Sequence, residues 1–172
     1  LGVGILSAAL KSGKLDGEAS ASAYAALVTS ATKLNKVGAE LAELPQVHAM
    51  TDVTGFGLLG HGLEMCRGSG LGASIDFGAL PLLDNVADLV REYRTGASGR
   101  NWDSYGAEAE LGAGIQPWQR DLLTDPQTSG GLLVSVEPDG VSEVLSLLRA
   151  SGLPQAAVIG SMREGEPRIR VS

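Results

Sequence analysis

The sequence predicts a mixed α/β (α+β) domain, in which one mixed β-sheet is layered with helices. Segments with strand-like and helix-like spacing of apolar residues alternate along the chain. Many of the 24 glycines form short clusters between these segments, where they permit tight turns. Only 4% of the residues are aromatic, so aliphatic side chains must fill the core. The length of 172 residues suits a single domain.

The first part of the chain predicts a connecting segment followed by a long helix. We assign residues 1–16 to an interdomain segment that contains the first strand, and residues 17–172 to one domain. Over Glu18–Leu44, apolar residues recur at helical spacing, which indicates an amphipathic helix with a break near Gly38. Pro45 ends this helix, because a proline disfavours helical backbone in the residue before it.

A strand, a glycine-rich turn and a second helix follow. Residues 46–51 predict the strand and residues 52–57 the turn. Residues 58–67 predict a helix that ends at Gly68, since glycine is common just beyond a helix C-terminus. Residues 72–77 alternate in polarity, as expected of a further strand.

The middle of the chain predicts a helix and then a long loop. Residues 84–93 have the helical pattern, with Asp84 as the N-cap. Residues 95–116 are polar and glycine-rich and include Trp102 and Tyr105. We expect this segment to be a long loop that is more mobile than its surroundings.

The last part of the chain predicts a strand, a helix and two strands that form a hairpin with its tip at Gly165–Glu166. These elements are expected at residues 132–136, 141–150, 156–161 and 167–171.

The charge and cysteine content exclude some partners. The net charge of −7 disfavours nucleic acid and anionic membranes, which are bound by clustered basic residues. A single cysteine, Cys66, excludes an internal disulfide and fits a reducing cytosol, so we expect a cytoplasmic location. No apolar run approaches the roughly 20 residues that span a bilayer.

The segment Thr51–His61 is the first candidate site. Asp52 follows a predicted strand and could serve as an oxygen ligand for Mg²⁺, while Thr54, Gly55 and Gly57 contact a phosphate. A simpler alternative is that Asp52 or Thr54 caps the following helix. From spacing alone the cap is the more common arrangement.

The segment Gln127–Gly131 is the second candidate site. Thr128, Ser129 and Gly130 could present successive amides and hydroxyls to an anion. The alternative is a turn that leads into the next strand and needs glycine only for its geometry.

Other candidates each have a simpler structural alternative. His61 could bind a metal or act as a base, but a packed or capping histidine is more common. Cys66 is expected to be a small core residue. Three aromatic residues could stack on an adenine or anchor the long loop, and two arginines could contact phosphate or only solvent: Trp102, Tyr105 and Trp118, and Arg94 and Arg100.

Three segments resemble the selenophosphate synthetase (selenide, water dikinase) family. The run Met50–His61 (MTDVTGFGLLGH) is similar to the signature that opens the family's C-terminal domain. Thr124–Leu133 (TDPQTSGGLL) is a second match, and Leu1–Ile5 (LGVGI) is a weaker third, with Val3 where the family commonly has threonine. The resemblance therefore extends over essentially the whole chain.

The resemblance implies a fold and a function. The family shares its architecture with the aminoimidazole ribonucleotide synthetase superfamily, whose C-terminal domain is an α/β/α layered fold with partial similarity to ferredoxin-like folds. Its members convert ATP, selenide and water into selenophosphate, orthophosphate and AMP. ATP lies between two domains with several Mg²⁺ ions, most of whose carboxylate ligands belong to the N-terminal domain. The one ligand from the C-terminal domain corresponds to Asp52.

The same resemblance implies that this chain needs a partner domain. The catalytic cysteine or selenocysteine and a lysine belong to the family's N-terminal domain, so we expect no catalytic residue in this chain and no activity from it alone. Dimer contacts also lie largely in that domain, and the complete protein is expected to be a homodimer. Two alternatives remain. The chain could belong to another ATP-using relative, of the aminoimidazole ribonucleotide synthetase, thiamine monophosphate kinase or hydrogenase maturation factor type, or it could be a non-catalytic binding module.

Overall fold

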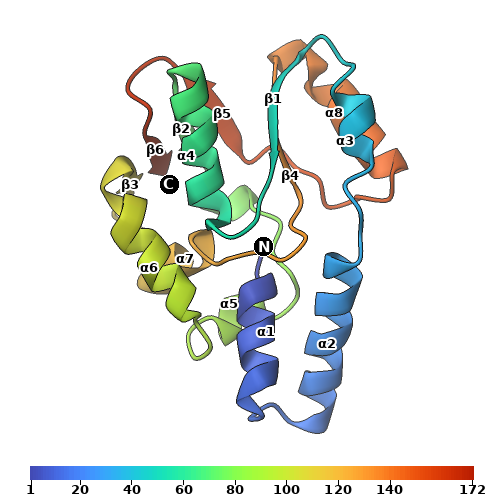
Figure 1. The fold of residues 1–172 in the computed structure, drawn as a ribbon, viewed down its shortest axis with the longest axis vertical. Coiled ribbons are helices and arrows are strands. Elements are labelled where there is room, and N and C mark those ends of the chain that lie inside the picture. Colours follow the sequence, from blue (N-terminus) through green and yellow to red (C-terminus); the bar gives the residue numbers. More distant parts are fainter.

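The computed structural model describes all residues from 1 to 172 as a layered arrangement of helices and strands (Figure 1). The α-helices are α1 (Val3–Ser12), α2 (Gly17–Ala31), α3 (Val37–Leu41), α4 (Gly57–Ser69), α5 (Val86–Leu89), α6 (Gly96–Tyr105), α7 (Pro117–Leu123) and α8 (Val141–Ala150). The strands are β1 (Val47–Asp52), β2 (Gly72–Ile75), β3 (Ala109–Leu111), β4 (Leu132–Val136), β5 (Gly160–Arg163) and β6 (Ile169–Val171). The predicted α/β class is confirmed, and β4 and α8 have their predicted bounds.

The strands form two sheets rather than the single mixed sheet predicted. β1 pairs only with β4, in antiparallel register, with Asp52 opposite Leu132. The second sheet has the order β3-β6-β2-β5 and contains parallel and antiparallel pairs. Figure 1 shows the β1–β4 pair between α4 and the helices α3 and α8. Local patterns predict strands but not which strands meet, and this accounts for the error.

The predicted hairpin at Gly165–Glu166 is wrong for the same reason. β5 and β6 do not pair with each other, because β2 lies between them and pairs with both. The connection therefore passes over the end of β2. Gly160 fits against the backbone of Ser74 in β2, where a β-carbon would overlap the carbonyl oxygen of that residue.

The N-terminal segment contains a helix, α1, instead of the expected first strand. Local spacing is ambiguous in this short apolar run. The helix is fixed by contacts from far along the chain. Gln127 accepts hydrogen bonds from the backbone N–H groups of Gly2 and Val3, and Asp125 accepts one from Ile5. These side chains satisfy donors that a helix N-terminus leaves without partners.

The long helix predicted over Glu18–Leu44 is divided into α2 and α3, and the division lies before Gly38. Asn35 lies in the linker between them and donates from Nδ2 to the carbonyl oxygen of Gly130, at 2.8 Å. Gly38 packs against Met50 and Leu132, so α3 covers the β1–β4 sheet. A side chain bound to a distant backbone group therefore decides where the helix breaks.

The helix predicted over residues 84–93 is shorter in the structure, where α5 spans only Val86–Leu89. Its N-cap is Asn85 in the left-handed region (φ 62°) and not Asp84. In α4, which comes before α5 in the chain, the C-cap is Gly70 rather than the predicted Gly68. α7 was not predicted; it starts with Pro117 at its first turn and a capping box between Gln116 and Gln119.

The segment 95–116 is a helix followed by a strand, α6 and β3, and not a long loop. Thr95 caps α6 by accepting a hydrogen bond from the N–H of Ser98. Tyr105 donates its hydroxyl to the carbonyl oxygen of Phe56, and the ring of Trp102 packs over Gly106. Tertiary contacts override the weak helical preference of a glycine-rich sequence.

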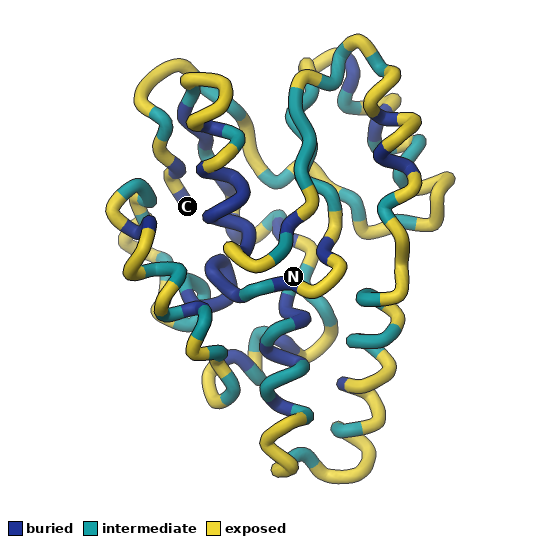
Figure 2. The backbone as a smooth tube through the Cα atoms, in the orientation of Figure 1, coloured by how far each residue is buried: buried dark blue, intermediate teal, exposed yellow.

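Two clusters of buried apolar residues stabilise the fold (Figure 2). The larger contains 19 buried residues and joins α1, α4, α7, β2 and β6. The smaller consists of Val37, Leu41 and Val144, packed against side chains of β1 and β4. Cys66 is fully buried in the larger cluster, as predicted. The β1–β4 sheet thus lies over the smaller cluster, and the turn after β1 reaches the larger one through Val53.

Candidate functional site

The two glycine-rich segments singled out in the sequence lie against each other. The N–H of Val53 donates to the carbonyl oxygen of Gly131 at 2.9 Å, and the N–H of Gln127 donates to that of Thr54 at 3.0 Å. These bonds continue the β1–β4 pairing into the turn after β1. Residues 52–57 and 124–131 therefore form a single structural unit.

Glycine is required where these segments approach most closely. A β-carbon on Gly130 would overlap the carbonyl oxygen of Val53. Gly57 has a φ of 68°, and a β-carbon there would lie 2.7 Å from the backbone carbon of Thr124. The glycines thus let two backbone segments pass without intervening side chains.

Asn101 of α6 joins the same two segments. Its Nδ2 donates to the carbonyl oxygens of Gly55 and Thr124, both at 2.9 Å. The sequence does not single out this residue, because its polar, glycine-rich surroundings predict a loop. A side-chain amide that bridges two distant carbonyl groups leaves no periodic signal in the sequence.

The weakest of the three matching segments, Leu1–Ile5, is bound to the same unit. Asp125 is fully buried and Gln127 is 6% exposed. Both accept hydrogen bonds from the start of α1, and Gln127 also donates to the Asp125 carboxylate at 3.0 Å. Burial raises the pKa of Asp125 to about 6, although the hydrogen bonds from Ile5, Gln127, Gly4 and Thr95 favour its charged form.

This pKa predicts a pH-dependent stability. An ordinary aspartate, as in the unfolded chain, has a pKa of 3.8. The folded state holds the Asp125 proton more tightly, so the contribution of this group to stability is lost as the pH rises from about 4 to about 6. Between pH 6.5 and pH 4.5, the wild-type protein should gain about 2 kcal/mol in free energy of unfolding relative to Asp125→Asn. Urea unfolding across this range measures the difference, and parallel curves for the two proteins would contradict the prediction.

Asp52 is exposed at the end of β1, beside an open hollow of about 400 Å³. The hollow is lined by Asn35, Gly38, Ala39, Met50, Thr51, Asp52 and Leu132. A carboxylate and the Oδ1 of Asn35 are the kinds of oxygen that Mg²⁺ accepts as ligands. No group of three or more His, Cys, Asp or Glu side chains is placed to hold a metal. At this hollow the chain therefore offers one carboxylate, which by itself does not make a metal site.

The helix-cap alternative for the first segment is wrong. The N-cap of α4 is Phe56, and no side chain caps this helix. Thr54 directs its hydroxyl instead to Nε2 of His61, at 3.1 Å. His61 is 8% exposed, and its Nδ1 lies 2.8 Å from Oε2 of Glu64. The expectation of a packed histidine is confirmed.

The candidate phosphate contacts differ in availability. Gly57 is buried and its N–H donates to the carbonyl oxygen of Thr54, so that amide is not open to a phosphate. Gly130 is also buried. Gly55, Thr128 and Ser129 are exposed, and Ser129 has a φ of 49°, in the left-handed region that a side chain rarely occupies.

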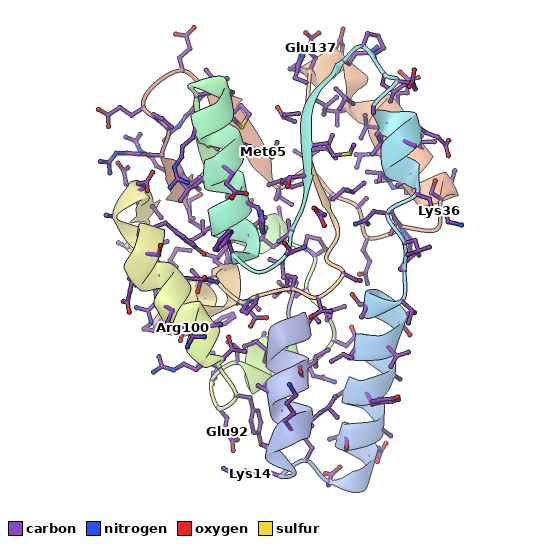
Figure 3. The ribbon with its side chains drawn as sticks, viewed as in Figure 1. Lys14, Lys36, Met65, Glu92, Arg100 and Glu137 are labelled. Carbon is purple, nitrogen blue, oxygen red and sulfur yellow. The ribbon has the colours of Figure 1, made fainter.

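The remaining candidates have structural partners. Trp118 packs edge-on against Phe77, with ring centroids 5.6 Å apart, and Arg120 lies over the ring of Trp102. Arg94 lies 3.6 Å from the carboxylate of Asp121 and is largely exposed. Arg100 is exposed on α6 (Figure 3). The aromatic residues therefore anchor α6 and α7 to the body of the domain.

The fold and the joined glycine-rich segments define a member of the AIR synthase related protein family, C-terminal domain: that family's model matches residues 1–172, and the chain belongs to it. Within it, the chain is 56% identical to a selenide, water dikinase of Paraburkholderia xenovorans over 172 residues and 56% identical to one of Pseudomonas straminea. These matches cover 99% of this chain and 48% and 47% of the relatives. The chain thus spans about half the length of the curated relatives it matches.

Solved structures show the same fold at much lower identity. A thiamine-monophosphate kinase from Stenotrophomonas maltophilia matches with a TM-score of 0.64 at 20% identity, over 100% of this chain and 47% of that one. The hydrogenase maturation protein HypE of E. coli matches with a TM-score of 0.62 at 22% identity, over 99% and 43%. A HypE solved in complex with ATP matches with a TM-score of 0.54 at 18% identity, over 81% and 36%. None of the helices in this chain has the length and apolar character needed to cross a membrane.

Proposed function

We propose that this chain is the C-terminal, ATP-cleft half of a selenide, water dikinase, a kinase of selenium metabolism that makes selenophosphate, orthophosphate and AMP from ATP, selenide and water. The observation that carries the proposal is the meeting of the three matching segments at the end of β1, beside the exposed Asp52. In this arrangement residues 17–172 form the ATP-cleft domain, and residues 1–16 connect it to the N-terminal domain.

The residues at this end of β1 have distinct roles in the proposal. Asp52 holds one Mg²⁺ of the ATP complex. When bound, the cation neutralises charge on the phosphates during phosphoryl transfer. Gly55, Thr128 and Ser129 are exposed and contact phosphate, whereas Gly57 and Gly130 allow the close backbone approach that places them. No residue of this chain acts as nucleophile.

The remaining partners follow from the same proposal. The N-terminal domain supplies the catalytic cysteine or selenocysteine, the lysine and most cation ligands, and contributes to a homodimer. The product selenophosphate is the selenium donor in selenocysteine biosynthesis. A single, buried cysteine suits the reducing conditions that selenide requires, which supports a cytoplasmic location.

The products formed by the complete protein test this proposal. Given ATP, Mg²⁺ and selenide, it should form AMP, orthophosphate and selenophosphate in equal amounts, as measured by ³¹P NMR. Residues 1–172 alone should form no AMP above background, because one carboxylate cannot hold the several cations that neutralise a triphosphate during transfer. Formation of ADP in place of AMP by the complete protein would contradict the dikinase assignment and favour a simple kinase.

A further inference from the structure

A group of arginine side chains, here called the arginine cluster, lies where the loop between α5 and α6 meets α7. Its members are Arg91, Arg94, Arg100 and Arg120. Nη1 of Arg94 lies 3.6 Å from Oδ2 of Asp121, and Nη2 of Arg120 lies 2.7 Å from Oδ1 of the same carboxylate. The two guanidinium groups therefore share one acidic partner, whose side chain is only 9% exposed.

The other two arginines lie close by. The guanidinium carbon of Arg91 lies 5.2 Å from the ring centroid of Trp118, which precedes Asp121 by three residues on α7. Arg100 folds back toward the first residue of α6, because its Nη1 lies 3.5 Å from the place that a β-carbon on Gly96 would take. Figure 3 shows Arg100 near the loop that joins α5 to α6. Arg91 and Arg100 are exposed, and neither forms an ion pair.

The cluster carries an excess of positive charge. Its four guanidinium groups have one ion-paired carboxylate among them, that of Asp121. Of the acidic residues nearby in the chain, Glu92 pairs with Lys14, and Asp88 and Asp103 form no ion pair. Other ion-paired arginines each have a glutamate of their own, in the pairs Arg67–Glu108, Arg168–Glu166 and Arg170–Glu110. In a chain of net charge −7, four cations around one anion produce a local positive potential that attracts anions.

The two tryptophans support the guanidinium groups of the cluster. Arg91 lies over the ring of Trp118, and the guanidinium carbon of Arg120 lies 5.5 Å from the ring centroid of Trp102. A guanidinium group is attracted to the face of an indole at such distances. Trp118 also packs edge-on against Phe77. Because both rings are engaged within the domain, they orient charged groups and do not stack on a nucleotide base.

We propose that the arginine cluster is a binding site for a small anion that carries several negative charges on phosphate groups. A guanidinium group is always charged and donates two parallel hydrogen bonds to phosphate oxygens. Arg91 and Arg100 have no ion pair, and the side chain of Arg94 is 66% exposed, so these three supply the donors. Arg120 is held by its contacts within the domain and contributes charge. The site uses no residue of the glycine-rich segments, so it goes beyond the proposed function.

A small ligand fits the cluster better than a nucleic acid. The overall negative charge of the chain repels a long polyanion, whose binding needs many basic residues spread along its backbone. Two sources share the remaining chemistry: the triphosphate of a nucleotide and free inorganic phosphate. Tripolyphosphate carries the phosphate chain without a base and is therefore the first probe.

Chemical modification of arginine tests the site in the complete protein without reference to activity. Phenylglyoxal modifies exposed guanidinium groups, and mass spectrometry gives the extent of modification at each arginine. Tripolyphosphate at about ten times its Kd should slow modification of Arg94 and Arg100 about tenfold. It should not protect Arg149, which is exposed on α8 and forms no ion pair. Equal rates at Arg94 and Arg100 with and without tripolyphosphate would overturn the proposal.

Variants of the complete protein test the same site by calorimetric titration with tripolyphosphate. The double change Arg94→Gln and Arg100→Gln should weaken binding at one site about a hundredfold, because each lost hydrogen bond to a charged group accounts for about tenfold. Replacing both by lysine, which retains the charge without the paired donors, should cause a smaller loss. Binding that is unchanged in the glutamine variant would place the anion elsewhere and contradict the proposal.

The matched control is the double change Lys11→Gln and Arg149→Gln. It removes the same charge from exposed positions outside the cluster and should change the Kd no more than about twofold, because exposed distant charges are screened by salt. A loss as large as that in the Arg94 and Arg100 variant would show that net charge, and not the cluster, decides binding.

Protection of Arg94 by other phosphates distinguishes the two sources. Protection by orthophosphate at concentrations similar to those of tripolyphosphate identifies free phosphate as the ligand. Protection by tripolyphosphate and by a non-hydrolysable ATP analogue, but not by orthophosphate, identifies a nucleotide. Protection by a single-stranded oligonucleotide alone would overturn the assignment to a small anion. Failure at the arginine cluster leaves the proposed function intact, because that function is tested by the products formed from ATP.

Discussion

Asp52→Asn in the complete protein should lower the rate of AMP formation about a hundredfold or more while the fold is retained. The neutral amide has nearly the same shape as the carboxylate but is a much poorer ligand for a divalent cation. Phosphoryl transfer depends on charge neutralisation, so the loss should appear in turnover and should not be recovered by excess ATP. The measurement is AMP release at saturating ATP.

The melting temperature of the same variant should change little. Asp52 is exposed, caps no helix and pairs with Leu132 only through the backbone. Asp103→Asn is a matched control, because Asp103 is exposed on α6 and forms no ion pair. It should retain normal activity. Near-normal turnover by Asp52→Asn would remove this residue from the cation site, and a large loss in the control would indicate a nonspecific effect of charge.

Gly130→Ala should destabilise the domain by about 3 kcal/mol or more. The added methyl group would overlap the carbonyl oxygen of Val53 and would lie 3.0 Å from the β-carbon of Gln127. Both neighbours belong to the unit that joins the two glycine-rich segments, so the backbones must separate. Separation would break the bonds from Val53 to Gly131 and from Gln127 to Thr54. Urea unfolding of the isolated chain measures the effect.

Gly131→Ala is the matched control for this prediction. Gly131 is adjacent to Gly130 and exposed, and a β-carbon there would meet no atom within 4 Å. Its φ lies outside the left-handed region. The change should therefore alter the free energy of unfolding by no more than about 0.5 kcal/mol. Equal effects at the two positions would show that the close approach at Gly130 does not limit stability.

The sequence predicts an element best where the pattern that determines its structure lies within one short segment. α8 has a regular apolar stripe, and β4 is apolar at every position except Ser135, so their predicted bounds agree with the structure. Cys66 lies in the buried face of α4, as expected of a small apolar residue. The segments that resemble the selenophosphate synthetases were also evident, because each is contiguous.

Predictions failed where partners lie far apart along the chain. α6 depends on Tyr105 and Asn101 binding carbonyl groups near Phe56, and α1 depends on Gln127 and Asp125. The number of sheets and the separation of β5 from β6 depend on strand pairing, which alternation does not specify. No window of local sequence contains these interactions.

For the candidate site, the sequence by itself determined the residue types: an aspartate at a strand end, glycines around it and a second glycine-rich segment. Only the tertiary structure decided how they act. In the structure no side chain caps α4, and the N–H of Gly57 donates to a carbonyl oxygen within the turn. Asn35 and Asn101 also bind carbonyl groups of the two glycine-rich segments. The physical reason is that each donor and acceptor must be satisfied in the folded chain, and its partner is chosen by proximity in space.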